Sequence, residues 1–187
     1  MQTIDLYQTY FSDILRYLKR FLPETQAEDL AQEVFIKADK GLKHFRGDAS
    51  TKTWLYRIAT NTLRDFLRSK SHRVDDAIIQ ISNHELEQYK DSLSEDFSIE
   101  QDTIRDEMNA CIREFILRLP ENYSTVLVLS DLEGYTNQEV ADILTLSLET
   151  VKIRLHRARA RLKEELSQGC DFSLNSSNTL ECQRKEK

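Results

Sequence analysis

Apolar residues recur every three to four positions over most of the chain, which is the spacing of an amphipathic α-helix. In the first such segment Leu6, Tyr10, Ile14 and Leu18 lie four residues apart, and Pro23 then breaks the pattern. The chain contains only 4 Gly and 2 Pro, so helix breakers are rare. The pattern therefore predicts a mainly helical protein.

Local signals at their ends define the next two helices. Thr25 and Glu28 have the spacing of a capping box, in which a hydroxyl and a carboxylate bond to backbone N–H groups at a helix start. Gly41 is predicted to end that helix. A loop over residues 45–50 precedes a third helix, expected over about residues 51–69. Its predicted buried face carries Leu55, Ile58, Ala59, Thr62 and Phe66.

Helical spacing weakens over residues 73–103 and returns at Ile104. Pro120 is expected just inside the start of a helix that carries Val126, Leu127 and Leu129, and the chain is predicted to turn at Gly134. These boundaries predict an all-α fold of two small helical domains. The domains cover residues 1–72 and 104–166, and the polar segment 73–103 joins them.

The second domain contains the layout of a helix-turn-helix. Thr136 and Glu139 form a second capping box before a short helix, and a brief turn follows over residues 144–146. Ser147 is then predicted to cap a longer helix over about residues 148–166. Two helices joined by a tight turn are typical of this DNA-binding motif.

The C-terminal tail, residues 167–187, has a different pattern. Polar and apolar residues alternate on either side of residues 175–178. This alternation fits either a small β-hairpin or a disordered tail.

Charge is distributed very unevenly along the chain. The net charge is −6, but eleven acidic residues lie between Asp75 and Glu107, where only Lys90 and Arg105 are basic. Residues 150–163 instead hold six Lys and Arg and no acidic residue. The acidity is therefore concentrated in the linker, and the basic charge in the last long helix is available for an anionic partner.

The last long helix has the surface expected of a DNA-reading helix. Val151, Leu155, Ala158 and Leu162 form its buried face. An α-helix fits the major groove, where basic side chains reach base edges or phosphates and an apolar one meets a thymine methyl group. A basic helix that is merely solvated is the alternative, which the preceding capping box and turn disfavour. The candidate contacts are Lys152, Ile153, His156, Arg157 and Arg159.

Two further helices carry candidate binding faces. In the third helix Trp54, Arg57, Asn61, Arg64 and Arg68 share one face, which suits unpaired DNA because bases stack on aromatic rings and cations hold phosphates. A core tryptophan beside solvated arginines explains the same pattern equally well. The second helix presents Asp29, Gln32 and Glu33, with Phe35 as a candidate exposed aromatic. That face suits either a protein-docking surface or an ordinary solvated one.

Enzymatic, metal and membrane signals are not found in the sequence. It contains no glycine-rich phosphate loop, no G-x-S-x-G and no H-E-x-x-H motif, so an enzyme is not expected. The three cysteines, Cys111, Cys170 and Cys182, form no C-x-x-C pair, so neither a metal site nor a cofactor is predicted. For Cys170 and Cys182 in the tail, metal binding or redox sensing is the alternative to incidental thiols. The sequence has no apolar run long enough to cross a bilayer, and its N-terminal residues do not have the pattern of a signal peptide. A cytoplasmic location without membrane insertion is therefore expected.

Two sets of motifs together resemble a known family. Residues 27–38, the run Phe45-Arg46-Gly47-Asp48 and residues 53–61 resemble region two of bacterial extracytoplasmic-function sigma factors of the sigma-70 family. Residues 119–121, 134–141 and 149–159 resemble region four of the same factors. The resemblance covers about residues 5–72 and 105–166 in the family's order. It implies an alternative sigma factor that binds core RNA polymerase, recognises promoters and melts DNA for transcription initiation.

The resemblance also implies roles for the matched positions. Asp29, Gln32, Glu33 and Phe35 match the polymerase-docking helix, and Trp54 matches a structural aromatic. The loop over residues 45–52 and Asn61 match the pocket for a flipped base of the start-proximal promoter element. The residues predicted to bind that element are Phe45, Asp48, Lys52, Arg57, Asn61, Arg64 and Arg68. Lys152, Ile153, His156 and Arg157 match the residues that read the upstream element.

The resemblance implies three partners, namely core RNA polymerase, promoter DNA in duplex and melted form, and an anti-sigma factor. Lys152 stands where many members carry Arg, which forms a bidentate fork to guanine that Lys cannot form. A free-standing helix-turn-helix regulator is the rival interpretation, and it leaves the first domain without a role. A protein adaptor that has lost DNA binding leaves the basic helix unexplained.

Overall fold

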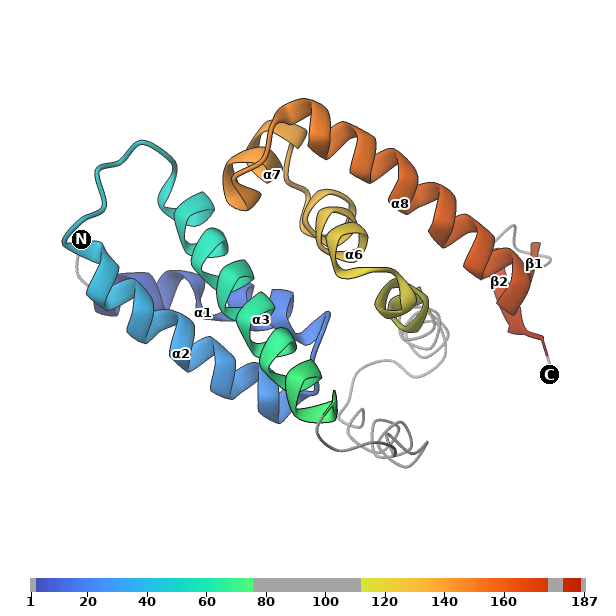
Figure 1. Ribbon diagram of the computed structural model, residues 1–187, viewed down its shortest axis with the longest axis horizontal. Coiled ribbons are helices and arrows are strands. Elements are labelled where there is room, and N and C mark those ends of the chain that lie inside the picture. The colour runs from blue at the N-terminus through green and yellow to red at the C-terminus, as the bar shows by residue number, and fades with distance from the viewer. Residues whose placement is uncertain (1–2, 76–111, 175–179, 186–187) are drawn as a thin grey trace. The chain divides into compact units, whose positions relative to one another are not determined.

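The computed structural model describes residues 3–75, 112–174 and 180–185. It confirms the predicted all-helical architecture, and it adds one two-stranded hairpin (Figure 1). Most of the predicted acidic linker, and Cys111 with it, lies outside the described residues. The elements are α1 (Thr3–Lys19), α2 (Glu24–Leu42), α3 (Thr51–Asp75), α6 (Glu121–Leu127), η1 (Val128–Leu132), α7 (Asn137–Leu144), α8 (Leu148–Gly169), β1 (Cys170–Leu174) and β2 (Leu180–Arg184).

The chain divides into two compact units, and each is described by itself. The first contains α1, α2 and α3, and most of α7 is assigned to it. The second contains α6, η1, α8 and the hairpin.

The first unit is held together by the apolar faces of α1, α2 and α3. Leu6, Ile14 and Leu18 of α1 are fully buried, as their spacing predicts. The buried hydroxyl of Tyr17 forms a hydrogen bond with the Oγ1 of Thr60 at 2.9 Å. This bond satisfies two polar groups in the core and ties α1 to α3.

The predicted boundaries of α2 are wrong at both ends. The helix begins at Glu24, and Pro23 is its N-cap without a side-chain cap bond, so Thr25 lies inside the first turn rather than at a capping box. The Pro23 carbonyl accepts a hydrogen bond from the Ala27 N–H at 2.8 Å, which explains the early start. Gly41 lies within the last turn rather than after it, because the helix continues to Leu42.

Helix α3 extends six residues beyond the predicted end at residue 69. Its start is capped by Ser50, whose Oγ accepts a hydrogen bond from the Thr53 N–H at 3.0 Å. Leu55, Ala59 and Thr62 are buried as predicted, whereas Ile58 and Phe66 are only half-buried. The core face is completed by the buried side chains of Tyr56, Thr60 and Leu63.

The second unit begins with a helical segment over residues 112–118, followed by α6 and η1. Pro120 is the N-cap of α6 rather than a residue just inside it, so the helix begins at Glu121, one residue later than predicted. Beyond Leu127 the helix widens into the π-helical segment η1, in which the Glu133 N–H donates to the Val128 carbonyl at 2.9 Å. The chain then turns at Gly134, which adopts φ 75° as a glycine readily does.

The turn between α7 and α8 has the predicted form. Helix α7 ends at Leu144, and Thr145 adopts a left-handed conformation with φ 55°. Ser147 then caps α8, its side chain accepting a hydrogen bond from the Thr150 N–H at 3.2 Å. Both the position of the turn and the predicted N-cap are confirmed.

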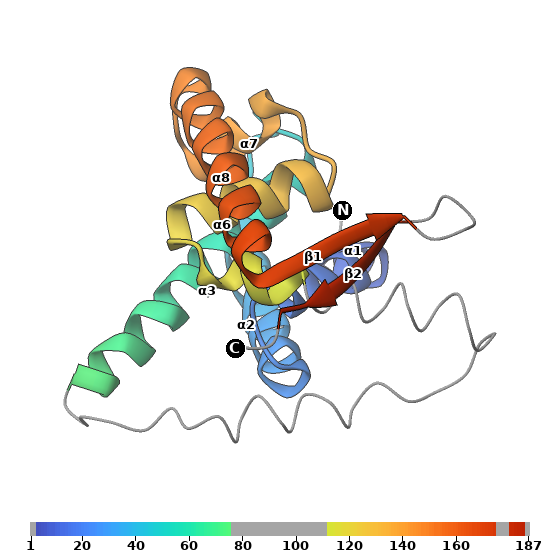
Figure 2. The same ribbon diagram turned by 90° about the vertical axis from the view of Figure 1, so that its right-hand side faces the viewer.

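The C-terminal tail forms the hairpin that its alternating pattern allowed (Figure 2). Strands β1 and β2 are antiparallel, with Cys170 opposite Arg184. The Cys170 side chain is buried, and the backbone N–H of Lys185 donates to the Gly169 carbonyl at 3.0 Å. The hairpin therefore returns the chain to the end of α8.

Candidate nucleic-acid interface

Helix α8 separates a buried apolar face from an exposed polar one. Val151, Leu155 and Ala158 are buried, as predicted, and Leu162 is half-buried. The five side chains predicted to contact duplex DNA are all exposed: Lys152, Ile153, His156, Arg157 and Arg159. Lys152, Arg157 and Arg159 are the cations among these five exposed side chains. Because they are accessible on one side of α8, this side can approach a phosphate backbone.

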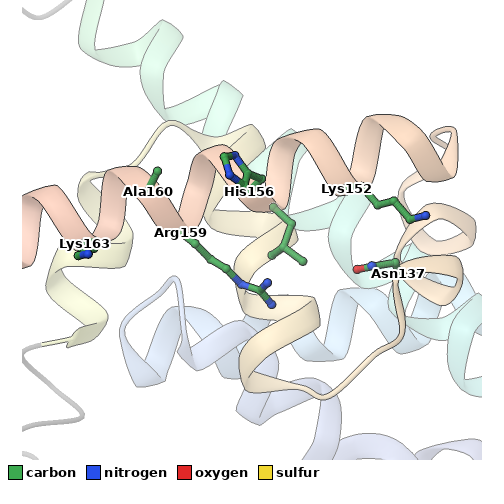
Figure 3. Close-up of a pocket in the computed structure, with 7 residues that line it drawn as sticks. Asn137, Lys152, His156, Arg159, Ala160 and Lys163 are labelled. Carbon is green, nitrogen blue, oxygen red and sulfur yellow. The ribbon is translucent and has the colours of Figure 1, made fainter.

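A shallow groove of about 350 Å³ lies along this exposed side of α8 (Figure 3). The basic side chains that line it come from successive turns of α8. Asn137, the first residue of α7, contributes an amide. The lining residues are Asn137, Lys152, Leu155, His156, Arg159, Ala160 and Lys163. Sequence reasoning identified most of the basic residues but missed Asn137.

Arg159 is engaged in a bidentate ion pair that the sequence did not reveal. Its Nε donates to the Oδ2 of Asp131 at 2.9 Å, and its Nη2 donates to the Oδ1 at 2.6 Å. The hydrogen bond from Arg159 and its positive charge hold the pKa of the Asp131 carboxyl below its ordinary value, although partial burial opposes this shift. Asp131 therefore remains charged at neutral pH.

Arg161 belongs to the packing of the unit rather than to the groove. Its guanidinium lies over the ring of Tyr123 of α6, 5.0 Å from the ring centroid. This cation–π contact joins α6 to α8, which the charge pattern alone could not show.

The loop before α3 is anchored by two aromatic residues. The rings of Phe45 and Trp54 lie 4.8 Å apart, and a Cβ on Gly41 would stand 3.2 Å from the Trp54 ring. Trp54 therefore packs on both the loop and α2. This contact supports the structural role implied by the family resemblance over a free stacking platform for bases.

The remaining residues predicted for the start-proximal element lie in the loop and on the outer face of α3. Asp48, Asn61 and Arg68 are exposed, while Arg57 and Arg64 are half-buried. Arg68 forms an exposed ion pair with the neighbouring Asp65 at 2.6 Å.

Lys52 lies at the start of α3 beside an acidic residue of α1. Its Nζ is 3.3 Å from the Oδ2 of Asp13, and it also lies over the Tyr56 ring at 5.9 Å. Arg57 donates two hydrogen bonds to the Asp142 carbonyl, from its Nε at 2.9 Å and its Nη2 at 2.5 Å. The outer face of α3 and its preceding loop thus bring the predicted residues onto one unit, and Lys52 and Arg68 each pair with a carboxylate there.

The predicted docking face of α2 differs from expectation at one position. Asp29, Gln32 and Glu33 are exposed, but Phe35 is only 4% exposed, so its predicted exposure is wrong.

Rings from α1 cover Phe35. Tyr7 lies 5.1 Å and Phe11 5.9 Å from it, measured between ring centroids. Ile36 is instead 56% exposed. It lies seven residues after Asp29, on the same side of α2 as Asp29, Gln32 and Glu33. This spacing could have identified Ile36 from the sequence.

The described residues contain no group of three side chains that could hold a metal ion. Among the helices of the described ranges, none combines the length and the apolar character that crossing a bilayer requires.

Comparison with known proteins matches both halves of the chain to one family. The model of sigma-70 region 2 matches residues 6–73, and that of sigma-70 region 4 matches residues 109–162.

Curated relatives match over most of their length. The RNA polymerase sigma-H factor of Pseudomonas aeruginosa is 36% identical, covering 84% of this chain and 82% of the relative. The RNA polymerase sigma factor YlaC of Bacillus subtilis is also 36% identical, covering 87% and 91%. The ECF RNA polymerase sigma-E factor of Escherichia coli K12 is 30% identical, covering 84% and 82%.

Two solved structures share the fold. CnrH, in complex with the cytosolic domain of CnrY, matches with a TM-score of 0.63 and 24% identity over 89% of this chain and 88% of that one. RpoE of Bartonella quintana, in complex with the anti-sigma factor NepR, matches with a TM-score of 0.63 and 20% identity over 87% and 95%.

Proposed function

We infer the detailed function of this chain from one premise: it belongs to the extracytoplasmic-function sigma factors of the sigma-70 family. It is an alternative sigma factor that directs promoter recognition in transcription initiation. The roles of single residues are best supported by the exposure of the basic side of α8, a helix whose start is capped by Ser147.

We propose that the exposed side of α8 reads the upstream promoter element in the major groove. Lys152, His156 and Arg157 donate hydrogen bonds to base edges or phosphates, since all three project from the N-terminal half of the helix. Ile153 contacts a thymine methyl group, and this contact would explain why an apolar side chain is exposed on this face. Arg159, one turn beyond His156, binds the phosphate backbone.

The first unit is proposed to hold the melted start-proximal element. The loop residues Phe45 and Asp48, with Lys52 and Asn61, hold an unpaired base, and the arginines of the outer α3 face bind its flanking phosphates. These arginines are Arg57, Arg64 and Arg68. Binding unpaired bases more tightly than paired ones captures the melted state, so the protein acts by binding and without catalysing a reaction.

The exposed row on α2 is proposed to dock on core RNA polymerase. Asp29, Gln32 and Glu33 supply polar contacts, and the exposed Ile36, rather than the buried Phe35, supplies the apolar contact. Protein interfaces combine an apolar centre with a polar rim, and this row contains both.

The proposed regulatory partner is an anti-sigma factor. RpoE of Bartonella quintana, which shares the fold, is bound to the anti-sigma factor NepR. The proposed site of action is the cytoplasm, where promoter DNA and polymerase meet.

Run-off transcription tests this function. Bacterial core polymerase is combined with the full chain and a library of promoter fragments, and specific initiation is expected only when the chain is present. Arg157→Ala is expected to reduce initiation, whereas Arg118→Ala, which removes an exposed arginine of the second unit outside α8, is the matched control. Absence of initiation, together with failure to co-elute with core polymerase, would overturn the proposal.

The same experiment addresses the rival function of a free-standing helix-turn-helix regulator. That function requires tight duplex binding by the isolated chain. The sigma proposal requires weak binding without polymerase, because the chain carries a net charge of −6 and phosphate binding depends on cations. Gel-shift titration of the selected fragments separates the two.

A further inference from the structure

We propose that Asp131 is a positioning residue, which holds the guanidinium of Arg159 so that its remaining N–H groups face a DNA phosphate. This inference rests on the proposed function of α8. It assigns a role in recognising the upstream element to a residue that lies in η1, outside α8.

The π-helical segment η1 gives Asp131 its orientation. Each residue of an α-helix advances about 100° around the axis, so the extra residue in a π-turn shifts the following side chains by that amount. Within η1, Val128 and Leu129 are buried, while Asp131 reaches Arg159 of α8. The widened turn therefore lets Val128 and Leu129 pack in the core while Asp131, three residues after Val128, points toward Arg159.

The geometry of the pair leaves donors available for a ligand. A guanidinium carries five N–H groups in a planar fork, and Asp131 accepts from the Nε and from one Nη. The Nη1 donors are not used by this carboxylate. The Arg159 side chain remains 57% exposed and lines the groove with Lys152 and His156. An arginine held by one edge and open at the other matches the bidentate geometry of a phosphate.

Two physical effects of Asp131 on DNA binding have opposite signs. Its negative charge lies beside a cation of the binding face and repels phosphates. Its hydrogen bonds restrict the rotamers of a long side chain, so less conformational entropy is lost when that side chain binds DNA. The proposal requires that positioning outweigh repulsion, and this makes it testable by removing the charge alone.

The test measures equilibrium binding of the holoenzyme to a promoter fragment selected by run-off transcription, over a range of salt concentrations. Asp131→Asn is expected to weaken binding about tenfold, as losing a charge-assisted contact would. It should also reduce the magnitude of the slope of log K against log salt by about one, the loss of one phosphate contact. Glu114→Gln is the matched control, because it breaks another carboxylate–arginine pair of the second unit, with Arg118.

The Arg159→Ala background separates positioning from a merely structural role. In that background Asp131→Asn is expected to have no further effect on binding or on the salt slope, because its target is gone. An equal loss in both backgrounds would assign Asp131 a structural role and overturn the proposal. Tighter or unchanged binding by Asp131→Asn alone would also overturn it. If Arg157→Ala and Arg159→Ala both leave promoter binding intact, the proposed function of α8 itself fails.

Discussion

Gly169, the last residue of α8, lies against a fully buried aromatic ring. A Cβ at this position would stand 2.4 Å from the Cζ and 2.6 Å from the Cε1 of Phe115. Carbon atoms in ordinary contact are about 3.5–4.0 Å apart. Because Phe115 is packed in the core, its ring cannot move aside into solvent. Gly169→Ala therefore forces either the ring or the end of α8 to shift.

The expected cost follows from two opposing terms. Overpacking a core by one methyl group costs about 1–3 kcal/mol. Replacing a helical glycine with alanine returns up to about 1 kcal/mol, and less at a helix end. The net result is a loss of about 1–2 kcal/mol in the free energy of unfolding. For a chain of this size that loss lowers the Tm by about 2–8 °C.

Thermal unfolding followed by circular dichroism measures this change. Gln168→Ala is the control, since it alters an exposed neighbour in the same turn. Phe115→Leu makes room for the new methyl group, so Gly169→Ala should cost less in that background than in the native chain. A Gly169→Ala protein that melts at or above the native temperature would refute the packing argument.

Ser147→Ala removes the cap of α8 and is expected to lower the free energy of unfolding by about 1 kcal/mol in urea titration, while Ser147→Asp retains most of it. The Arg159 hydrogen bond lowers the pKa of Asp131, so the stabilisation from this pair is fully present above the ordinary value of 3.8 and is lost as pH falls through the lowered one. Acid titration should therefore destabilise the native chain more steeply than Asp131→Asn below that value, and parallel curves would contradict the linkage. Ile36→Ser should reduce co-elution with core polymerase at an unchanged Tm, whereas Phe35→Ala should lower the unfolding free energy by about 3–5 kcal/mol. Normal co-elution of Ile36→Ser would remove that residue from the docking face.

Local periodicity was sufficient where a feature depends on one helix and its flanking residues. The burial of Val151, Leu155 and Ala158 in α8 and its cap at Ser147 were predicted correctly, because helix spacing and capping chemistry both act over a few residues. The cap of α2 was predicted wrongly for a related reason. Thr25 has the right chemistry, but the N-cap is Pro23, two residues earlier.

Features that depend on contacts between helices could not be read from the pattern. The burial of Phe35 requires the rings of Tyr7 and Phe11, which a different helix supplies. The pairing of Asp131 with Arg159 joins residues 28 positions apart and depends on a π-turn whose sequence reads as ordinary helix. For this reason the sequence located the candidate site without revealing which cations are already paired.

The hairpin also determines where a label can be placed. Because the Lys185 N–H is bonded to the Gly169 carbonyl, Lys185 lies beside the end of α8 that is distant from Ser147. Helix α8 has 22 residues, so its two ends are about 33 Å apart. A fluorophore or affinity tag attached there would report on the protein while remaining well away from the end of α8 that is proposed to meet the bases.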